Sequence, residues 1–334
     1  QGVLMAAIIG SALTDPKEAL FSIALWTLLL AFASASLDIV LDAYRIRILK
    51  PFEQAAGAAA FVTGYRIAIL AAGSGAVLAS TVLPWAHVYM GLAALQAMGI
   101  AAVLWAPLDT GPRLELQGRT PRVPLFKRTV VAPILALRSQ KALGWLILLV
   151  LLYKLADGFL GSMAFKFVRE TGFTKEEIVG IQQVGGLMAT MAGGALGGYL
   201  GLKLPLSRFL LIGGSLQMLS NLVYYWLASL PAPGLHHLTL AVLVEEAAGG
   251  LGTAAFMAMV ALLCHREFAA THYAFLTSLM ALGRTLVASS SGFAAVSLGW
   301  PSFFVASALL GLLGLLLVFK LGRILDQLAH QDDH

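Results

Sequence analysis

A long apolar run ends in the stretch Ser36-Leu37-Asp38-Ile39-Val40-Leu41-Asp42-Ala43-Tyr44-Arg45. Asp38 and Asp42 are four residues apart and Arg45 follows three residues later, so a helix would place all three side chains on one face. A charged side chain inside hydrocarbon costs about 3 kcal/mol on insertion scales. That cost is tolerated where the face meets protein or water. This face therefore predicts a polar pathway through a membrane.

The composition of the whole chain is that of a membrane protein. Of the 334 residues, 59% are hydrophobic and only 12% are charged, whereas soluble domains carry about 25% charged residues. Glycine accounts for 34 residues, which suits close helix packing in lipid. The single cysteine, Cys264, excludes an intrachain disulfide framework, and no His, Cys, Asp or Glu residues show metal-ligand spacing. We expect an all-α, polytopic membrane protein without a metal or other cofactor.

Runs of about 20 apolar residues divide the chain into hydrophobic segments. Ten are predicted, the first of them partial: 2–13, 19–43, 54–80, 86–106, 142–167, 177–200, 208–230, 237–263, 271–296 and 301–320. Residues 107–141 hold several prolines and seven Lys and Arg, and predict a linker. We expect residues 1–106 to belong to an N-terminal bundle, residues 142–321 to form a six-helix bundle, and residues 322–334 to form a tail.

The distribution of Lys and Arg predicts the orientation in the membrane. Fifteen of the 22 fall in one alternate set of loops, which includes the linker, and only Lys17, Arg169 and Lys175 fall in the other. This bias places the linker and the C-terminus in the cytoplasm. It also explains the net charge of +5 without nucleic-acid binding.

A weak internal repeat relates the two halves of the chain. Gly64-Tyr65-Arg66 lies in the middle of the third segment and Gly283-Arg284 in the middle of the ninth, and each follows a segment with carboxylates. Halves related by a repeat around a central cytoplasmic loop are typical of transporters. Six segments follow the linker and four precede it, so a six-plus-six arrangement predicts about two further helices before residue 1.

Carboxylates within apolar segments are candidate proton carriers. Asp38 and Asp42 could instead form an inter-helix salt bridge. Glu245 and Glu246 are adjacent and point about 100° apart on a helix, and two like charges in low dielectric favour protonation of one. Asp157 lies three residues after Lys154, which indicates either a self-neutralising pair or a site whose pairing changes during transport.

Cations and amides within the segments are candidate substrate ligands. Arg66 and Arg284 lie too deep to reach the interface easily, and a guanidinium binds carboxylate or phosphate with two hydrogen bonds. They could instead be structural counter-ions. Gln182 and Gln183 suit sugar hydroxyls or, equally, inter-helix hydrogen bonds. The full predicted set adds the neighbours of these charges: Tyr44, Arg45, Tyr65, Arg66, Tyr153, Lys154, Gln182, Gln183 and Arg284.

These residues resemble the AmpG family of muropeptide permeases, within the major facilitator superfamily. The resemblance covers essentially the whole chain in order. The short turn with Lys203 and Arg208 is similar to the superfamily's loop signature. The more specific blocks are Asp38–Arg45, Gly64-Tyr65-Arg66, Tyr153-Lys154 with Asp157, Glu245 with Gly249–Phe256, and Phe268–Thr271 running to Gly283-Arg284 and Gly299-Trp300.

The resemblance implies a two-bundle, major-facilitator-like fold and a proton-driven importer in the inner membrane of a Gram-negative bacterium. The implied substrate is an N-acetylglucosaminyl-anhydro-N-acetylmuramyl peptide, taken up by a monomer for cell-wall recycling and β-lactamase induction. Leu37, Gln183 and Glu246 depart from the residues expected in the family. Three other readings stay open: a carrier of another anion such as acetyl-CoA, a transport-dead sensor, and a membrane-embedded enzyme. The last lacks a nucleophile or metal constellation in the sequence.

Overall fold

The computed structural model describes residues 1–15, 17–107, 131–138 and 142–330, and all elements in these ranges are helices. They belong to two compact units: residues 1–48 with 64–117, and residues 49–63 with 118–334, as far as each is described. Most of the predicted linker, including its Arg113, Arg119, Arg122, Lys127, Arg128 and Lys141, lies outside the described residues. The domain boundaries drawn at the linker stay a prediction.

The first unit is built on a short helix packed between two long ones. Helix α1 (Gly2–Leu13) contacts both α2 (Leu20–Ile48) and α5 (Trp85–Trp105). Gly10 makes the α1–α2 contact close, because a Cβ there would lie 2.4 Å from the ring of Trp26. The unit also contains the later part of α3 (Gln54–Ile69), the π-helical turn η2 (Leu70–Gly75) and α4 (Ala76–Ala79).

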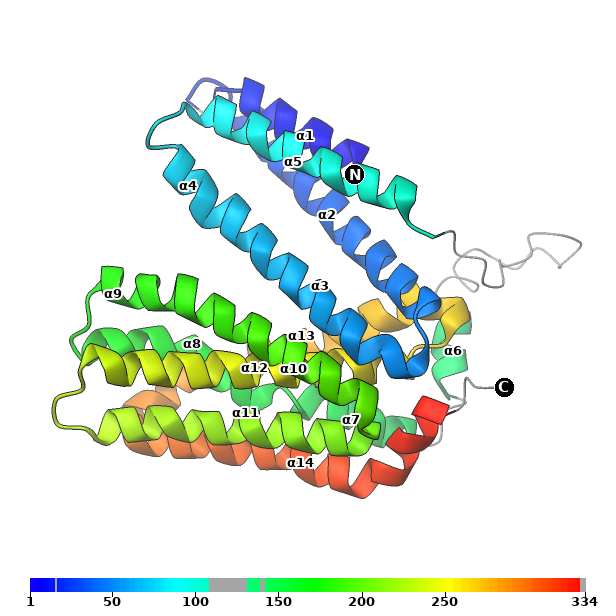
Figure 1. The fold of residues 1–334 in the computed structure, drawn as a ribbon, viewed down its shortest axis with the longest axis vertical. Helices are drawn as coiled ribbons and strands as arrows, with labels where there is room; N and C mark the ends of the chain where they lie inside the picture. The colour runs from blue at the N-terminus through cyan, green and yellow to red at the C-terminus, as the bar shows by residue number, and fades with distance from the viewer. Residues whose placement is uncertain (16, 108–130, 139–141, 331–334) are drawn as a thin grey trace, which may run out of the picture. The chain divides into compact units, whose positions relative to one another are not determined.

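The second unit is a bundle of long antiparallel helices. Its elements are the 3₁₀ turn η1 (Pro51–Glu53), the start of α3, α6 (Ala132–Arg138), α7 (Leu143–Leu152), α8 (Leu155–Glu170), α9 (Lys175–Gly180), the π-helical turn η4 (Ile181–Gly186), α10 (Leu187–Lys203), α11 (Leu206–Ser229), α12 (Leu235–Leu263), the 3₁₀ turn η5 (Arg266–Phe268), α13 (Ala269–Leu298) and α14 (Trp300–His330). Figure 1 shows α10, α12, α11 and α14 running side by side, and each of these neighbours is in contact.

Buried aromatic rings hold one end of this bundle. Phe159 on α8 stacks on Phe303 of α14 at 4.8 Å between ring centroids, and Phe167 meets Phe304 edge-on at 4.8 Å. Tyr224 of α11 completes the cluster at 5.5 Å from Phe304. Aromatic pairs of this geometry add about 1 kcal/mol each beyond their buried area. They fix α8, α11 and α14 relative to one another.

Helices α10 and α12 cross with their backbones in contact. A Cβ on Gly193 would lie 1.9 Å from the carbonyl oxygen of Ala247, and a Cβ on Gly250 would lie 2.2 Å from that of Thr190. Small residues permit such close approach in membrane bundles. The glycine-rich sequence of α10 therefore serves close packing against α12.

We predict that Gly193→Ala destabilises the protein by about 2 kcal/mol, because the added methyl group must push the two backbones apart. The matched control is Gly194→Ala, since a Cβ there meets no atom within 4 Å. Thermal unfolding in detergent should show a melting temperature lower by about 5 °C for the first variant and no loss for the second. Equal melting temperatures would contradict the backbone contact.

Seven of the described helical stretches are long and apolar enough to cross a membrane. They are Leu20–Ile48, Pro51–Ala79, Trp85–Trp105, Leu143–Glu170, Leu235–Leu263, Arg266–Leu298 and Trp300–Leu328. The other predicted hydrophobic segments, at α1, α9 to α10 and α11, are also helical. Many large apolar side chains on the helices are exposed, as expected of surfaces that face lipid.

The helices that carry the carboxylates repeat the same local pattern. Helix α2 and helix α12 each have 29 residues, and each is followed by a 3₁₀ turn, η1 or η5, that opens the next long helix. Arg66 lies on the helix after α2, and Arg284 lies on the helix after α12. The repeat seen weakly in the sequence is thus supported by matching secondary structure.

Three details differ from the sequence prediction. The segment predicted over 142–167 is helical and long enough to span a membrane, but its helix has a break at Tyr153 and Lys154, between α7 and α8. The predicted tail is helical as far as His330. Helix α6 was not predicted. His272 of α13 contacts it: its Nδ1 accepts the backbone N–H of His265 at 3.1 Å, which leaves Nε2 to donate to the carbonyl of Pro133 at 2.9 Å.

Candidate functional site

A helix break places the first charged pair of the second unit. Lys154 has φ −104° and ψ 11°, outside helical values, so α7 ends before it and α8 begins after it. Close contacts pack the break: a Cβ on Gly314 of α14 would lie 3.0 Å from Cα of Tyr153, and one on Gly214 of α11 would lie 3.2 Å from its ring. Interrupted helices are typical of binding sites in transporters.

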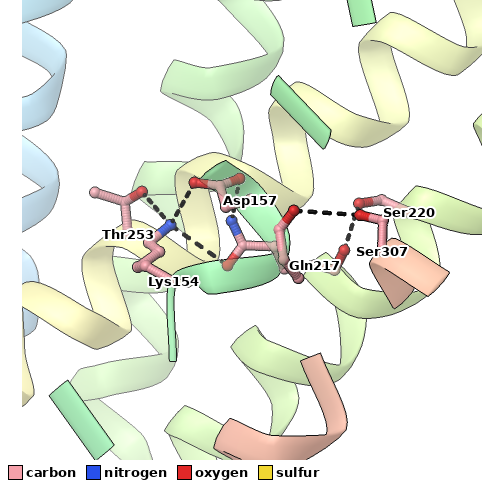
Figure 2. A network of polar contacts seen from close by, with 7 residues as sticks. Lys154, Asp157, Gln217, Ser220, Thr253 and Ser307 are labelled. Carbon is pink, nitrogen blue, oxygen red and sulfur yellow. Dashed lines mark hydrogen bonds and ion pairs between the residues drawn. The ribbon is translucent and has the colours of Figure 1, made fainter. Parts of the chain in front are cut away.

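Lys154 is the centre of a buried polar cluster in the bundle. Its Nζ lies 3.3 Å from Oδ2 of Asp157, 3.4 Å from Oε1 of Gln217 and 3.0 Å from Oγ1 of Thr253. Figure 2 shows these side chains converging from α8, α11 and α12. Lys154 and Gln217 are only 4% and 5% exposed. The predicted pairing of Lys154 with Asp157 is confirmed, but the lysine has two further partners from other helices.

Gln217 ties the cluster together. Its amide nitrogen donates to Oδ1 of Asp157 at 2.8 Å while its oxygen accepts from Lys154. The side chain has room because residue 252 is glycine: a Cβ there would lie 2.6 Å from Gln217 Oε1. Buried polar groups are stabilising only when satisfied, and here the ammonium, carboxylate and amide satisfy one another.

A second row of polar contacts lies beside the cluster. Asn221 donates to Ser307 Oγ at 2.9 Å, and Ser307 donates to the carbonyl of Ala156 at 3.3 Å. Ser220 donates to the backbone oxygen of Gln217 at 2.8 Å (Figure 2). These bonds connect α8, α11 and α14 around the break. They hold Gln217 and the first turn of α8 in place.

Tyr153 occupies a packing position beside the break. It is 6% exposed, its hydroxyl donates to the carbonyl of Leu210 at 2.9 Å, and its ring stacks on Phe256 at 5.9 Å. These contacts account for the side chain without a ligand. Its membership of the substrate-binding set stays a prediction.

Arg284 lies where α13 packs against α8, next to the cluster of Lys154. A Cβ on Gly158 would lie 3.2 Å from Cβ of Arg284, so α13 approaches α8 one residue after Asp157. The Arg284 side chain is exposed in the structure, and its role in substrate binding stays a prediction.

Glu246 is placed against the neighbouring helix pair. It accepts a hydrogen bond from the hydroxyl of Thr190, and its Cγ lies over Gly186, where a Cβ would be 3.3 Å away. Glu245 is half-buried on the adjacent face of α12. The expectation that the two carboxylates point to different surroundings fits this placement.

Gln182 and Gln183 lie on the π-helical turn η4, not on a regular α-helix as predicted. Gln182 is half-buried and Gln183 is exposed. π-Helical turns within α-helices are rare, but those that occur are often found at functional sites. The turn re-aims both amides relative to α9.

In the first unit, the structure pairs only part of the predicted charged face. Arg45 Nη2 lies 3.5 Å from Asp42 Oδ1, and Arg45 is buried. Asp38 is exposed one turn earlier. The Tyr44 hydroxyl donates to the carbonyl of Pro107 at 2.8 Å. Tyr65 is exposed and Arg66 is half-buried, on α3.

Sequence reasoning missed several polar residues that the structure brings to these sites, among them Gln217, Asn221, Thr253 and Thr190. Gln217 and Asn221 are four residues apart on α11, so a polar stripe on an otherwise apolar helix was a signal that could have found them. Thr190 gave no signal, because a lone threonine in a glycine-rich helix is unremarkable. Among the described residues, no group of three His, Cys, Asp or Glu side chains is placed to hold a metal ion.

The fold and the buried charges define a multi-pass α-helical membrane protein with a polar site between its helices. Comparison with known proteins gives the family. The chain is 36% identical over 335 residues to an anhydromuropeptide permease of Escherichia coli, covering all of this chain and 67% of that protein. It is 28% identical over 323 residues to a Rickettsia felis protein that carries the name AmpG 4, covering 96% and 77%. No protein-family model matches.

The chain belongs to the AmpG family of anhydromuropeptide permeases. Its relatives are named permeases and transporters, which supports a transporter rather than an enzyme.

Proposed function

We propose that this protein imports anhydro-muropeptides across the bacterial inner membrane by alternating access, driven by the proton gradient. The substrate class comes from the name of the Escherichia coli relative. Uptake would serve cell-wall recycling and the induction of β-lactamase. The chain would act as a monomer surrounded by lipid, with its C-terminus in the cytoplasm and with protons as the only co-substrate.

The observation that carries the proposal is the buried cluster of Lys154, Asp157, Gln217 and Thr253. A lysine held in the apolar part of a bundle marks a substrate or ion pathway by default. Three helices contribute to it, and it lies at a helix break (Figure 2). If Lys154 and Asp157 only neutralised each other on α8, Lys154 would not need the further contacts with Gln217 and Thr253 from α11 and α12.

Polar residues on the helices, from the buried Lys154 to the exposed Arg284, supply the chemistry that a muropeptide needs. Such a substrate has peptide carboxylates and sugar hydroxyls. Arg66, Arg284 and Lys154 would attract the carboxylates, and the amides of Gln182 and Gln183 would hydrogen-bond the sugars.

Protonation would couple the movement of protons to the movement of the substrate. Neutralising a buried carboxylate removes a charge from low dielectric and changes which salt bridges stabilise each state of the carrier. Asp38, Asp42, Asp157, Glu245 and Glu246 are the candidates for this role. The driving force is about 2.3 kcal/mol per proton at 100 mV, plus the pH gradient.

The test is uptake of labelled anhydro-muropeptide into proteoliposomes with and without an inward proton gradient. We expect accumulation above the external concentration with the gradient and only equilibration without it. Unlabelled acetyl-CoA serves as the control competitor and should not reduce uptake. The proposed substrate would be contradicted if no labelled muropeptide entered the proteoliposomes under either condition, or if acetyl-CoA reduced the uptake and unlabelled muropeptide did not.

A further inference from the structure

The hydroxyl of Thr190 faces two acceptors and has one hydrogen. Its Oγ1 lies 2.8 Å from the carbonyl oxygen of Gly186, four residues earlier, and in hydrogen-bond contact with Oε2 of Glu246. Thr190 is 2% exposed, so water does not compete for the bond. The direction of its O–H bond must therefore depend on what the carboxyl group offers.

Two arrangements are possible at this contact. An ionised Glu246 can only accept, so it takes the Thr190 hydrogen and the Gly186 carbonyl loses this donor. A protonated Glu246 can donate to Thr190 Oγ1, which leaves Thr190 free to donate to Gly186. The two arrangements differ in the proton and in one hydrogen bond to the backbone.

The backbone contacts keep this geometry fixed. The carbonyl of Thr190 lies against Gly250 of α12, one turn after Glu246, and Gly193 lies against Ala247. These contacts bring the backbones of α10 and α12 together and place the carboxyl group of Glu246 beside Thr190. A change of protonation at Glu246 would therefore act first on the hydroxyl of Thr190.

Gly186 is the last residue of the π-helical turn η4, which carries Gln182 and Gln183. A threonine bond to the carbonyl four residues back competes with regular helix geometry and bends helices. Forming or breaking the hydrogen bond from Thr190 to Gly186 would therefore change the geometry at the end of η4, the turn that carries Gln182 and Gln183.

We infer that Thr190 is a positioning residue that couples protonation of Glu246 on α12 to the π-helical turn η4. The inference deepens the proposed function, because it assigns a proton site and its link to the substrate amides. The step moves one proton: the carboxyl O–H of Glu246 breaks, the proton goes to water, and the Thr190 hydrogen turns from Gly186 to the carboxylate.

Other titratable groups lie near this site and contribute to the electrostatic potential at Glu246. Glu245 is adjacent on α12, and the buried phenol Tyr224 of α11 interacts electrostatically with both carboxylates. Glu246 has further polar or electrostatic partners. From α10 and η4, Thr190 and the amides of Gln182 and Gln183 contribute no charge. Lys154 reaches Thr253, two turns further along α12.

The experiment measures protonation at Glu246 directly. Dicyclohexylcarbodiimide modifies protonated carboxyl groups in apolar surroundings, and peptide mass spectrometry locates the adduct. We expect labelling of Glu246 in the purified full chain to fall as pH rises, and Glu246→Gln to remove the signal. In Thr190→Val the pH dependence of labelling should differ from that of the wild-type protein, because the ionised and the protonated carboxyl group each lose a different hydrogen bond to the hydroxyl.

Two variants control for packing. Thr190→Ser keeps the hydroxyl and should keep the midpoint of the wild-type protein. Thr239→Val removes a threonine with the same back-bond, 2.9 Å to the carbonyl of Leu235, but away from Glu246, and should not move it. An unmoved midpoint in folded Thr190→Val, or no labelling of Glu246 at any pH, would overturn the inference. Labelling does not need the muropeptide, so failure of the proposed substrate would be seen separately.

Discussion

Lys154→Met should abolish transport and destabilise the protein by about 2 kcal/mol. The change leaves Asp157 in the bundle without its ammonium, and breaking a fully buried pair costs about 3–5 kcal/mol. The expected cost is smaller because the Asp157 side chain keeps 25% exposure and the hydrogen bond from Gln217. Thermal unfolding and the initial rate of muropeptide uptake measure the two effects. We expect at least a tenfold loss of rate.

A matched pair on the same helix provides the control. Lys166 lies 3.8 Å from Glu170, and both side chains are about half exposed. Lys166→Met should cost less than about 0.5 kcal/mol, because exposed pairs contribute little, and should leave uptake unchanged.

The double variant Lys154→Met/Asp157→Asn separates a binding site from a self-neutralising pair. It removes both charges and keeps an acceptor for Gln217, so stability should return to within about 1 kcal/mol of the wild-type protein. If the cluster serves transport, uptake stays lost. Recovery of uptake together with stability would show that the pair is only structural.

Asp38→Asn should abolish accumulation while leaving a folded protein. One proton moving through 100 mV is worth about 2.3 kcal/mol, which supports roughly a 50-fold concentration ratio. The amide cannot carry a proton, so the ratio should fall to one. Asp38 is exposed on α2, and its loss breaks no buried contact, so stability should change by less than about 0.5 kcal/mol.

Exchange of labelled for unlabelled substrate distinguishes coupling from binding. Exchange needs no net proton movement and should persist in Asp38→Asn. The control Asp15→Asn changes an exposed loop carboxylate that accepts a hydrogen bond from the backbone N–H of Lys17 at 2.8 Å. It should behave as the wild-type protein. Unchanged accumulation in Asp38→Asn would reject the role of this carboxylate and leave Asp42, Glu245 or Glu246 to be tested in the same way.

The sequence predicted what depends on local spacing. Lys154 and Asp157 are three residues apart, and that distance alone brings their side chains together on one helix face or turn. The same holds for Asp42 and Arg45. The helices followed from runs of apolar residues, although the break at Lys154 did not, because an apolar run does not show where tertiary contacts interrupt a helix.

The contacts between different helices could not be predicted, although the polar stripe on α11 could have marked Gln217 as a candidate. Gln217 and Thr253 reach Lys154 from 63 and 99 residues away, and Thr190 reaches Glu246 across 56 residues. Nothing in the spacing of these residues indicates a contact. The glycines that permit the contacts were visible in the sequence, but which backbone each one would admit was not.

Composition and apolar periodicity by themselves determined that this chain is a helical membrane protein with ionisable groups at mid-helix, because the cost of charge in lipid leaves few other arrangements. Only the tertiary structure decided which of those groups share a site. Helix crossings are set by side-chain volume summed over whole interfaces, and at Gly193, Gly250 and Gly252 the missing side chains bring polar groups from distant segments within hydrogen-bond reach.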